Sequence, residues 1–564
     1  MRLSLPPTPS LNSPSRLFFA LAISMLTACE PQAPQGDNIA SASAAKASDG
    51  GAKGADAGAA KGDAGAAKSD AGMLTPSAVT IDDGTLNGSQ VGETRQFLGI
   101  PYAQPPIGEL RWKPPQPSAK WKSPRAATAF GKRCAQIAST VLMNAASEDE
   151  DCLYLNVWAP TKASALPVML WIHGGGNVNG SASEPVPYVN TGLFYDGTSL
   201  SQQGVVVVSF NYRLGVFGFF DHEGLGAEGG NQGLLDQVAV MEWVQKNIAK
   251  FGGDPDNVTI FGESAGSLDV CYHLASPKSN GLFHKAISQS GGCTTLLQTK
   301  ALAQTAASSL ATKLACTGSA DEVLSCLREK SVTELLAMGS TGFSPDLDGV
   351  FMPDQPRTLF DSGTIAKVPY LAGSNSDEGT LFVAASEVAD QAAYLAALGT
   401  SFGADRAAII EAQYPASKFP DGKPNAFKAA LARAVGDARL VCTTFDSAQR
   451  AIAAGSKVFY YNFDIPAPVG DLGATHGSEL TSVFGTSPSF TPAAKAASQM
   501  IQRYWTRFAK TGDPNGGDDL EWPALTSESN VRINLALEPS VVTDFRAAEC
   551  AFWRAGYERQ FPAP

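Results

Sequence analysis

The sequence predicts a doubly wound α/β fold, in which a mostly parallel central sheet is flanked by helices, and three observations support it. Strand-like runs such as 205–210 (VVVVSF) are largely apolar, as in a sheet covered on both faces. They alternate with helical runs such as 235–248, which is the pattern of α/β folds. Finally, an apolar run at 258–261, a glycine-flanked turn and a helix-compatible run at 267–274 form a strand–turn–helix unit.

The turn in this unit is the most informative segment of the chain. It has the sequence Gly262-Glu263-Ser264-Ala265-Gly266, a G-x-S-x-G motif. Glycine on both sides removes Cβ atoms from a tight turn, and the strained turn lifts the Ser264 hydroxyl clear of the sheet. Glycine and serine are common in turns, so the motif alone is weak evidence, but its setting is that of a nucleophile elbow. Ser264 is therefore the candidate nucleophile.

A serine hydroxyl needs a base, and the base needs an acid that orients it. In α/β-hydrolases these residues follow the serine in the order acid, then histidine. Of the five histidines, only His284 and His476 lie well after the motif. His284 precedes the next strand, whereas His476 occupies a polar loop beyond the strand-like run 458–463. We therefore expect His476 to be the base.

The acid is expected in a short apolar strand that runs into an acidic turn, at 368–379. Either Asp377 or Glu378 could face the histidine, and spacing alone does not choose between them.

An oxyanion needs preorganised N–H donors. The buried strand expected at 168–172 ends at His173-Gly174-Gly175-Gly176, and three glycines can turn their amides toward a ligand without steric cost. We expect the N–H groups of Gly175, Gly176 and Ala265 to form the oxyanion hole.

With these motifs in place, the chain resembles the type-B carboxylesterases, a family that includes cholinesterases and bile-salt-activated lipases. The resemblance runs from about residue 79 to about residue 562. The matching segments are 97–103, 106–112, 150–157, 211–215, 233–237, 251–255 and 288–291, together with the G-x-S-x-G motif. It implies an α/β-hydrolase fold, with helical insertions between about 380 and 455 that cap the pocket.

The resemblance also implies roles for particular residues. The family uses a glutamate as the triad acid, which selects Glu378 over Asp377. Glu263 and Ser290 are implied to lie beside the triad. Three disulfides are implied as well: Cys134–Cys152, Cys316–Cys326 and Cys442–Cys550. Such bridges indicate an oxidising compartment. Whether Cys271 and Cys293 pair or remain buried thiols stays open.

Two features depart from the family pattern. The first disulfide loop, 135–151, contains no aromatic residue, so a quaternary ammonium would lack its cation–π partner there and no choline preference is expected. Asp269 and Cys271 replace small residues that commonly follow the elbow. Asp269 could serve only to favour the positive N-terminal end of its helix, and a catalytic role is the alternative.

The N-terminus resembles an export signal. An apolar run at 17–25 is too short to span a bilayer and fits the h-region of a signal peptide. The ending Leu26-Thr27-Ala28-Cys29 resembles a bacterial lipobox, which predicts a lipoprotein signal peptide at 1–28 and a lipid anchor on Cys29. An ordinary secretory signal with an incidental cysteine is the alternative. The expected localisation is a bacterial cell envelope, lipid-anchored, or otherwise secreted.

Three segments are expected: the signal peptide, a disordered tether at 29–75, and a carboxylesterase domain at 76–564. The tether is mostly Ala, Gly, Asp, Lys and Ser, a composition that cannot bury enough apolar surface to fold. The formal net charge of −12, with no basic cluster, argues against nucleic acid and anionic membrane surfaces as partners. Membrane contact is expected only through the anchor.

The sequence thus predicts a serine hydrolase that cleaves small-molecule or lipid-like carboxylic esters through an acyl-enzyme, with a Ser264–His476–Glu378 triad. No cofactor is expected, and no metal, because no His, Asp and Glu cluster has ligand spacing. An amidase or carbamate hydrolase on the same triad, or a non-catalytic cholinesterase-like binding protein, are the alternatives. Acyl length, alcohol size and oligomeric state are not indicated.

Overall fold

The structure is a computed structural model that describes residues 75–139, 145–186, 192–339, 342–420, 425–468 and 470–560. The predicted signal peptide at 1–28, the predicted anchor residue Cys29 and nearly all of the predicted tether at 29–75 lie outside these residues.

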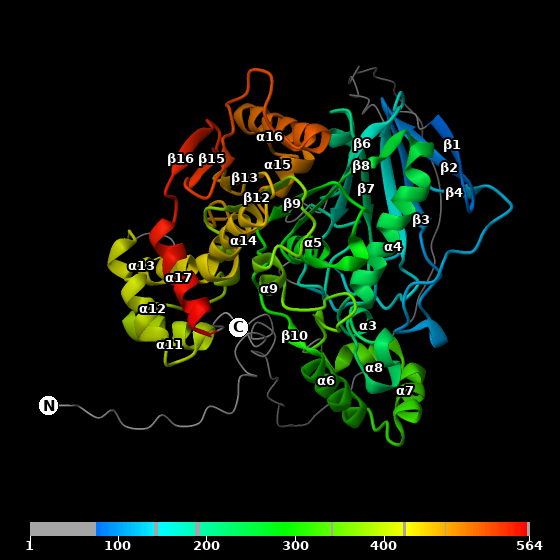
Figure 1. The fold of residues 1–564 in the computed structure, drawn as a ribbon, viewed down its shortest axis with the longest axis horizontal. Coiled ribbons are helices and arrows are strands. Elements are labelled where there is room, and N and C mark those ends of the chain that lie inside the picture. Colours follow the sequence, from blue (N-terminus) through cyan, green and yellow to red (C-terminus); the bar gives the residue numbers. More distant parts are fainter. Residues whose placement is uncertain are drawn as a thin grey trace, which may run out of the picture.

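One large sheet forms the centre of the fold (Figure 1). Its strands follow the order β1-β2-β3-β5-β7-β6-β8-β9-β12-β13-β15-β16, with β4 beside β2 and β14 beside β13. Their bounds are β1 Thr75–Ile81, β2 Gly84–Val91, β3 Thr94–Pro101, β4 Arg125–Ala126, β5 Tyr154–Pro160, β6 Leu166–Ile172, β7 Val206–Phe210, β8 Gly253–Glu263, β9 Lys285–Gln289, β12 Tyr370–Asn375, β13 Val458–Phe463, β14 Ala524–Leu525, β15 Val531–Leu535 and β16 Ser540–Thr543. A separate small sheet joins β10 (Gln298–Thr299) and β11 (Asp346–Leu347).

The middle of the large sheet is parallel. Neighbouring strands from β7 through β6, β8, β9, β12 and β13 to β15 all pair in parallel. The edges are antiparallel, with β1, β2, β3 and β5 on one side and β16 on the other. The predicted mostly parallel sheet flanked by helices is therefore confirmed.

The helices lie on both sides of the sheet and in insertions between strands (Figure 1). Their bounds are α2 Thr198–Ser201, α3 Gly215–Gly218, α4 Gln232–Asn247, α5 Ala265–Ala275, α6 Lys300–Lys313, α7 Ala320–Glu329, α8 Val332–Ala337, α9 Pro356–Asp361, α10 Gly379–Phe382, α11 Gln391–Phe402, α12 Ala407–Gln413, α13 Ala426–Gly436, α14 Cys442–Ala453, α15 Leu480–Phe484, α16 Pro492–Thr511 and α17 Ala547–Gln560.

The sheet separates two hydrophobic cores, because successive side chains of a strand point to opposite faces. In β6, Leu170 belongs to one core and its neighbour Trp171 to the other, and both are fully buried. Helix α16 covers the Trp171 side with side chains such as Trp505. Helices α4, α5 and α14 contribute to the opposite core, for example through Val270. The carboxyl ends of β6, β8, β12 and β13 carry the loops discussed below.

The helical insertion expected between about 380 and 455 is present as α10 to α14. In Figure 1, α11, α12 and α13 gather beside the C-terminal helix α17. A disulfide between Cys442 and Cys550 joins α14 to α17. The last turn of α10 carries Phe382, whose ring lies 5.1 Å from that of His476. This insertion therefore reaches the candidate site.

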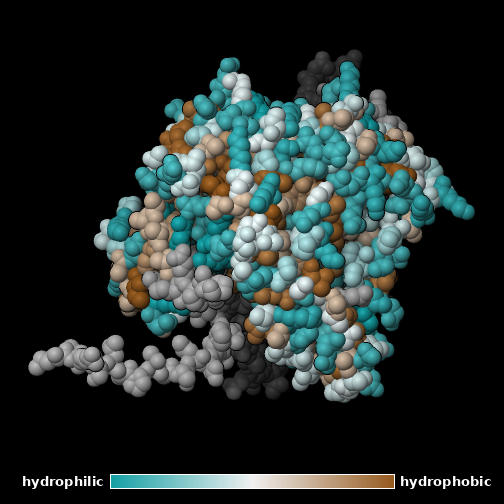
Figure 2. All heavy atoms as spheres, viewed as in Figure 1, coloured by the Kyte–Doolittle hydropathy of each residue, from teal (hydrophilic) through white to brown (hydrophobic). Residues whose placement is uncertain are grey.

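The face in Figure 2 is covered mainly by hydrophilic residues, with hydrophobic residues in scattered groups. The large exposed hydrophobic side chains come from separate elements, such as Ile107, Ile409 and Leu537. Among the described residues, no helix combines the length and apolar content needed to cross a bilayer.

Candidate active site

Ser264 stands between β8 and α5, at a turn with a strained backbone. Its φ and ψ are 57° and −122°, a conformation that L-residues rarely adopt. A Cβ atom at Gly262 would lie 2.5 Å from the carbonyl carbon of Gly266, and a Cβ at Gly266 would lie 2.1 Å from the carbonyl oxygen of Ile172. The two glycines of the motif are thus required by backbone packing, and the partly exposed Ser264 is left at the tip of the turn.

The glycine loop that follows β6 lies directly beside this turn. A Cβ atom at Gly174 would be 3.0 Å from the Cβ of Ser264, so only glycine permits this approach. Gly175 and Gly176 have φ values of 107° and 67°. In the described chain, the N–H groups of these two glycines donate to no other protein group. Ala265 begins α5, where the N–H groups have no partner within the helix.

His476 and Glu378 are joined by a hydrogen bond. The Nδ1 atom of His476 lies 2.7 Å from Oε2 of Glu378, whose other oxygen accepts from the N–H of Asn375 at 2.7 Å. Asp377, the alternative acid, instead accepts from the N–H of Ala474 at 3.1 Å. The structure therefore brings Glu378, and not Asp377, to the imidazole.

The other nitrogen of this imidazole faces Glu263. His476 Nε2 lies 3.2 Å from Glu263 Oε1, and among the described residues no direct hydrogen bond joins the ring to the Ser264 hydroxyl. Burial acts to lower the pKa of His476, but the charges of Glu263 and Glu378 outweigh it and raise the pKa above its usual value. Burial also raises the pKa of Glu263. While Glu263 is ionised, the imidazolium form is therefore stabilised between two carboxylates.

Ser290 follows β9 with a φ of 56°, and it is fully buried. Its N–H donates to the carbonyl of Gly373 at 2.8 Å, while its hydroxyl has no partner among the described residues. This hydrogen bond joins the residue after β9 to the neighbouring strand β12.

Two residues of the site, Glu479 and Phe382, were not singled out from the sequence. Glu479 is buried three positions after His476, and accepts from Asn375 Nδ2 at 2.6 Å and from Gln289 Nε2 at 3.1 Å. Phe382 covers one side of the imidazole. The H-x-x-E spacing was the only sequence signal for Glu479, and nothing in the sequence indicated Phe382.

The described part of the chain contains four disulfides. Three are the implied pairs Cys134–Cys152, Cys316–Cys326 and Cys442–Cys550. The fourth joins Cys271 of α5 to Cys293 after β9, which answers the question left open by the sequence.

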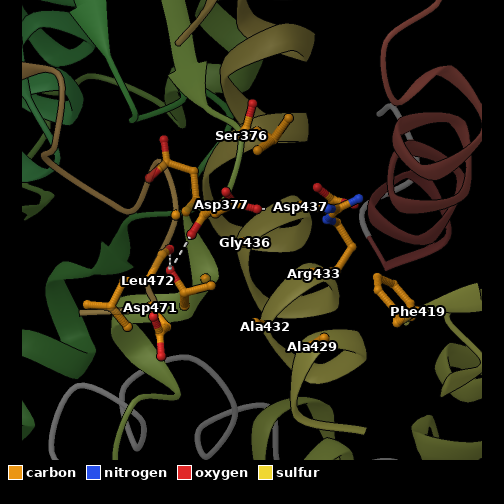
Figure 3. A pocket seen from close by; sticks show the side chains of 15 residues that line it. Ser376, Asp377, Phe419, Ala429, Ala432, Arg433, Gly436, Asp437, Asp471 and Leu472 are labelled. Atoms are coloured by element: carbon orange, nitrogen blue, oxygen red, sulfur yellow. Dashed lines mark hydrogen bonds and ion pairs between the residues drawn. The ribbon is translucent and has the colours of Figure 1, made fainter. Parts of the chain in front are cut away.

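A cavity of about 200 Å³ borders Glu378, and Figure 3 shows the side chains that line it. Arg433 of α13 points toward Asp377, with Nη2 and Oδ1 3.9 Å apart. Neither Ser264 nor His476 lines this cavity. It is therefore a space beside the acid of the candidate triad, separate from the hydroxyl expected to react. Within the described ranges, no group of three His, Cys, Asp or Glu side chains is arranged to hold a metal ion.

Comparison with known proteins agrees with this architecture. The sequence profile of the "Carboxylesterase family" matches residues 75–553. A protein named "Cholinesterase" from Mus musculus is 34% identical over 527 residues, which cover 84% of this chain and 86% of that protein. The chain therefore belongs to the carboxylesterase family and is a carboxylic ester hydrolase.

Proposed function

We propose that Ser264 is the nucleophile, with His476 as its base and Glu378 as the acid that orients the base. Ser264 attacks the acyl carbon of an ester while the imidazole takes its proton. His476 then protonates the leaving alcohol, and a water molecule repeats the cycle on the acyl-enzyme. The 2.7 Å bond between His476 Nδ1 and Glu378 is the observation that carries this proposal, since it leaves Nε2 as the nitrogen for proton transfer.

The oxyanion is bound by the N–H groups of Gly175, Gly176 and Ala265. Two of these donors lie on a loop that packs against the Cβ of Ser264 and the carbonyl of Glu263, and the third begins the helix after Ser264. Loss of one such donor typically costs about 3 kcal/mol of transition-state stabilisation. Since Nε2 of His476 faces Glu263 and not Ser264, the proposed reaction requires the imidazole to turn from Glu263 toward Ser264 before proton transfer.

The test is covalent capture of the nucleophile. A fluorophosphonate should label Ser264, as located by peptide mass spectrometry, and a short-chain p-nitrophenyl ester should release a burst of p-nitrophenol. The Ser264→Ala variant should neither be labelled nor hydrolyse the ester. If this variant hydrolyses the ester at the parental rate, the proposal is wrong.

The second candidate activity is hydrolysis of amides or carbamates, because the same groups could protonate an amine leaving group. Matched ester and anilide substrates, measured on the same preparation, separate the two activities.

We also propose that the chain is exported and attached to a bacterial membrane through Cys29. The four disulfides fit an exported protein, and the lipobox-like sequence ends at Cys29. Metabolic labelling with a radioactive fatty acid should mark the parent but not a Cys29→Ala variant; equal labelling would contradict the anchor.

A further inference from the structure

The proposed reaction makes no use of Asp269, although this carboxylate is fully buried in the helix that begins after Ser264. Its Oδ1 accepts from Asn177 Nδ2 at 2.9 Å, and its Oδ2 accepts from Gln237 Nε2 at 2.7 Å. Neither partner is charged, and burial raises the pKa of Asp269 to about 7. Burying a carboxylate without a cation is costly, so its placement calls for a compensating role.

Asn177 connects this carboxylate to the glycine loop. It follows Gly176 directly and has a φ of 58°, a left-handed conformation that is strained for residues other than glycine. Its side chain holds it there, because Oδ1 lies 2.9 Å from the hydroxyl of Tyr212 while Nδ2 donates to Asp269. The carbonyl of Asn177 also accepts from the N–H of Gly215 at 2.7 Å.

The start of the same loop is held by the same tyrosine. The Tyr212 hydroxyl also lies 2.9 Å from the carbonyl oxygen of His173, so its single proton is shared between this oxygen and Asn177 Oδ1, and its ring stacks on the His173 ring at 4.4 Å. Tyr212 therefore contacts both ends of the loop, His173 and Asn177. Asp269 is the residue of this network that lies on α5, the helix that begins directly after Ser264.

We propose that Asp269 is a positioning residue which, through Asn177, fastens the Gly174–Gly176 loop to helix α5. This inference rests on the proposed function. The N–H groups of Gly175 and Gly176 belong to the loop, whereas that of Ala265 belongs to the helix. The Asp269–Asn177 bond sets the distance between these two groups of donors, and hence their fit to the oxyanion. Asp269 itself acts only through Asn177.

The groups around Asp269 determine whether an asparagine can replace it without breaking the hydrogen-bond network. Gln237 Oε1 lies 2.8 Å from Nε2 of His273, whose Nδ1 lies 2.7 Å from the Ser279 hydroxyl. Burial lowers the pKa of His273 to about 3, so its neutral ring can exchange the donor and acceptor roles of its two nitrogens. Tyr212 and Tyr272 are the other titratable groups that sense the charge of Asp269.

An asparagine at this position can therefore keep the network intact. In an Asp269→Asn variant, the new amide oxygen accepts from Asn177 and the new NH₂ group donates to Gln237, whose amide turns over against His273. In an Asp269→Leu variant, the amides of Asn177 and Gln237 both lose their acceptor, and the loop is released from the helix.

The experiment compares these two variants with Gln237→Met, which removes the other partner of Asp269 but leaves the bond to Asn177. For a p-nitrophenyl ester, Asp269→Leu should lower kcat about 10- to 100-fold with KM nearly unchanged, because small misplacements of catalytic groups have effects of this size. Asp269→Asn and Gln237→Met should stay within about threefold of the parent, on the same scale. Affinity for an aryl trifluoromethyl ketone, which forms an oxyanion on Ser264, should fall in parallel with kcat.

Urea unfolding of each variant separates loss of positioning from loss of fold. If Asp269→Leu does not fold, Asn177→Gly replaces it, since glycine accepts the φ of 58° and removes only the side-chain link. Parental kcat and ketone affinity in a folded Asp269→Leu or Asn177→Gly variant would overturn the inference, and so would equal losses in Gln237→Met. These results are interpreted in a parent whose activity is abolished by Ser264→Ala; a parent that remains active without Ser264 would instead refute the proposed function.

Discussion

Replacing Glu263 by glutamine tests how the carboxylate beside the imidazole sets the pH range of the enzyme. Glu263 Oε1 and His476 Nε2 are 3.2 Å apart. Two unit charges at this distance attract by about 1.3 kcal/mol at the dielectric constant of water and by about 5 kcal/mol at an effective value of about 20. At about 1.36 kcal/mol per pKa unit, loss of the Glu263 charge should lower the pKa of His476 by at least about one unit.

Because only the neutral imidazole can act as a base, a lower pKa allows activity at lower pH. The acid limb of kcat/KM for a p-nitrophenyl ester should therefore move down by about one unit or more in Glu263→Gln, measured from about pH 5 to pH 10. The matched control is Glu479→Gln: this carboxylate is also buried but bonds to Asn375 and Gln289 rather than to the ring, so its shift should be smaller. An acid limb that stays in place or moves up in Glu263→Gln would refute the reasoning.

Three further predictions concern the triad, the disulfides and a buried acid. Glu378→Gln should lower kcat about 10³–10⁴-fold, because an amide no longer orients and stabilises the imidazolium; a loss below tenfold, measured with the same ester, would argue against Glu378 as the acid. Replacing Cys442 and Cys550 by serine opens a loop with a sequence separation of 108 and should lower the free energy of unfolding by about 4–5 kcal/mol in urea titrations; an unchanged midpoint would contradict this. Burial and the charge of Asp221 raise the pKa of Asp346 to about 8, so the folded state binds more protons than the unfolded chain between about pH 4 and 8, and stability falls as pH rises through this window. The Asp346→Asn variant lacks this titration, so its free energy of unfolding should rise relative to that of the parent from pH 4 to pH 8. A difference between variant and parent that does not change with pH would count against the raised pKa.

The sheet and the nucleophile turn were predictable because their signals are local. The run of apolar residues in β7 indicates a strand that is covered on both faces of the sheet. The glycines at 262 and 266 indicate a turn in which a side chain at either position would clash with the backbone. The choice between Asp377 and Glu378 was different. They are adjacent in sequence, and only the path of the chain decides that one meets His476 and the other meets Ala474.

Contacts between distant segments left no trace that a single sequence could show. Asn177 and Asp269 are 92 positions apart, and each alone has an ordinary explanation, as a turn residue or as an acid near a helix start. Their roles emerge only when the loop after β6 is packed against α5. Likewise, the Cys271–Cys293 bond depends on β8 and β9 being neighbours in the sheet, which places the segments that follow them side by side.

That fourth bond also bears on how the enzyme meets reducing conditions. Cys271 and Cys293 are both fully buried, and thiol–disulfide exchange requires a thiolate to reach a sulfur atom. Dithiothreitol or glutathione can attack only after the surrounding segments separate. The Cys271–Cys293 disulfide, once formed in an oxidising environment, should therefore resist reduction while the protein is folded. A folded molecule moved into a reducing solution should keep this bond until it unfolds.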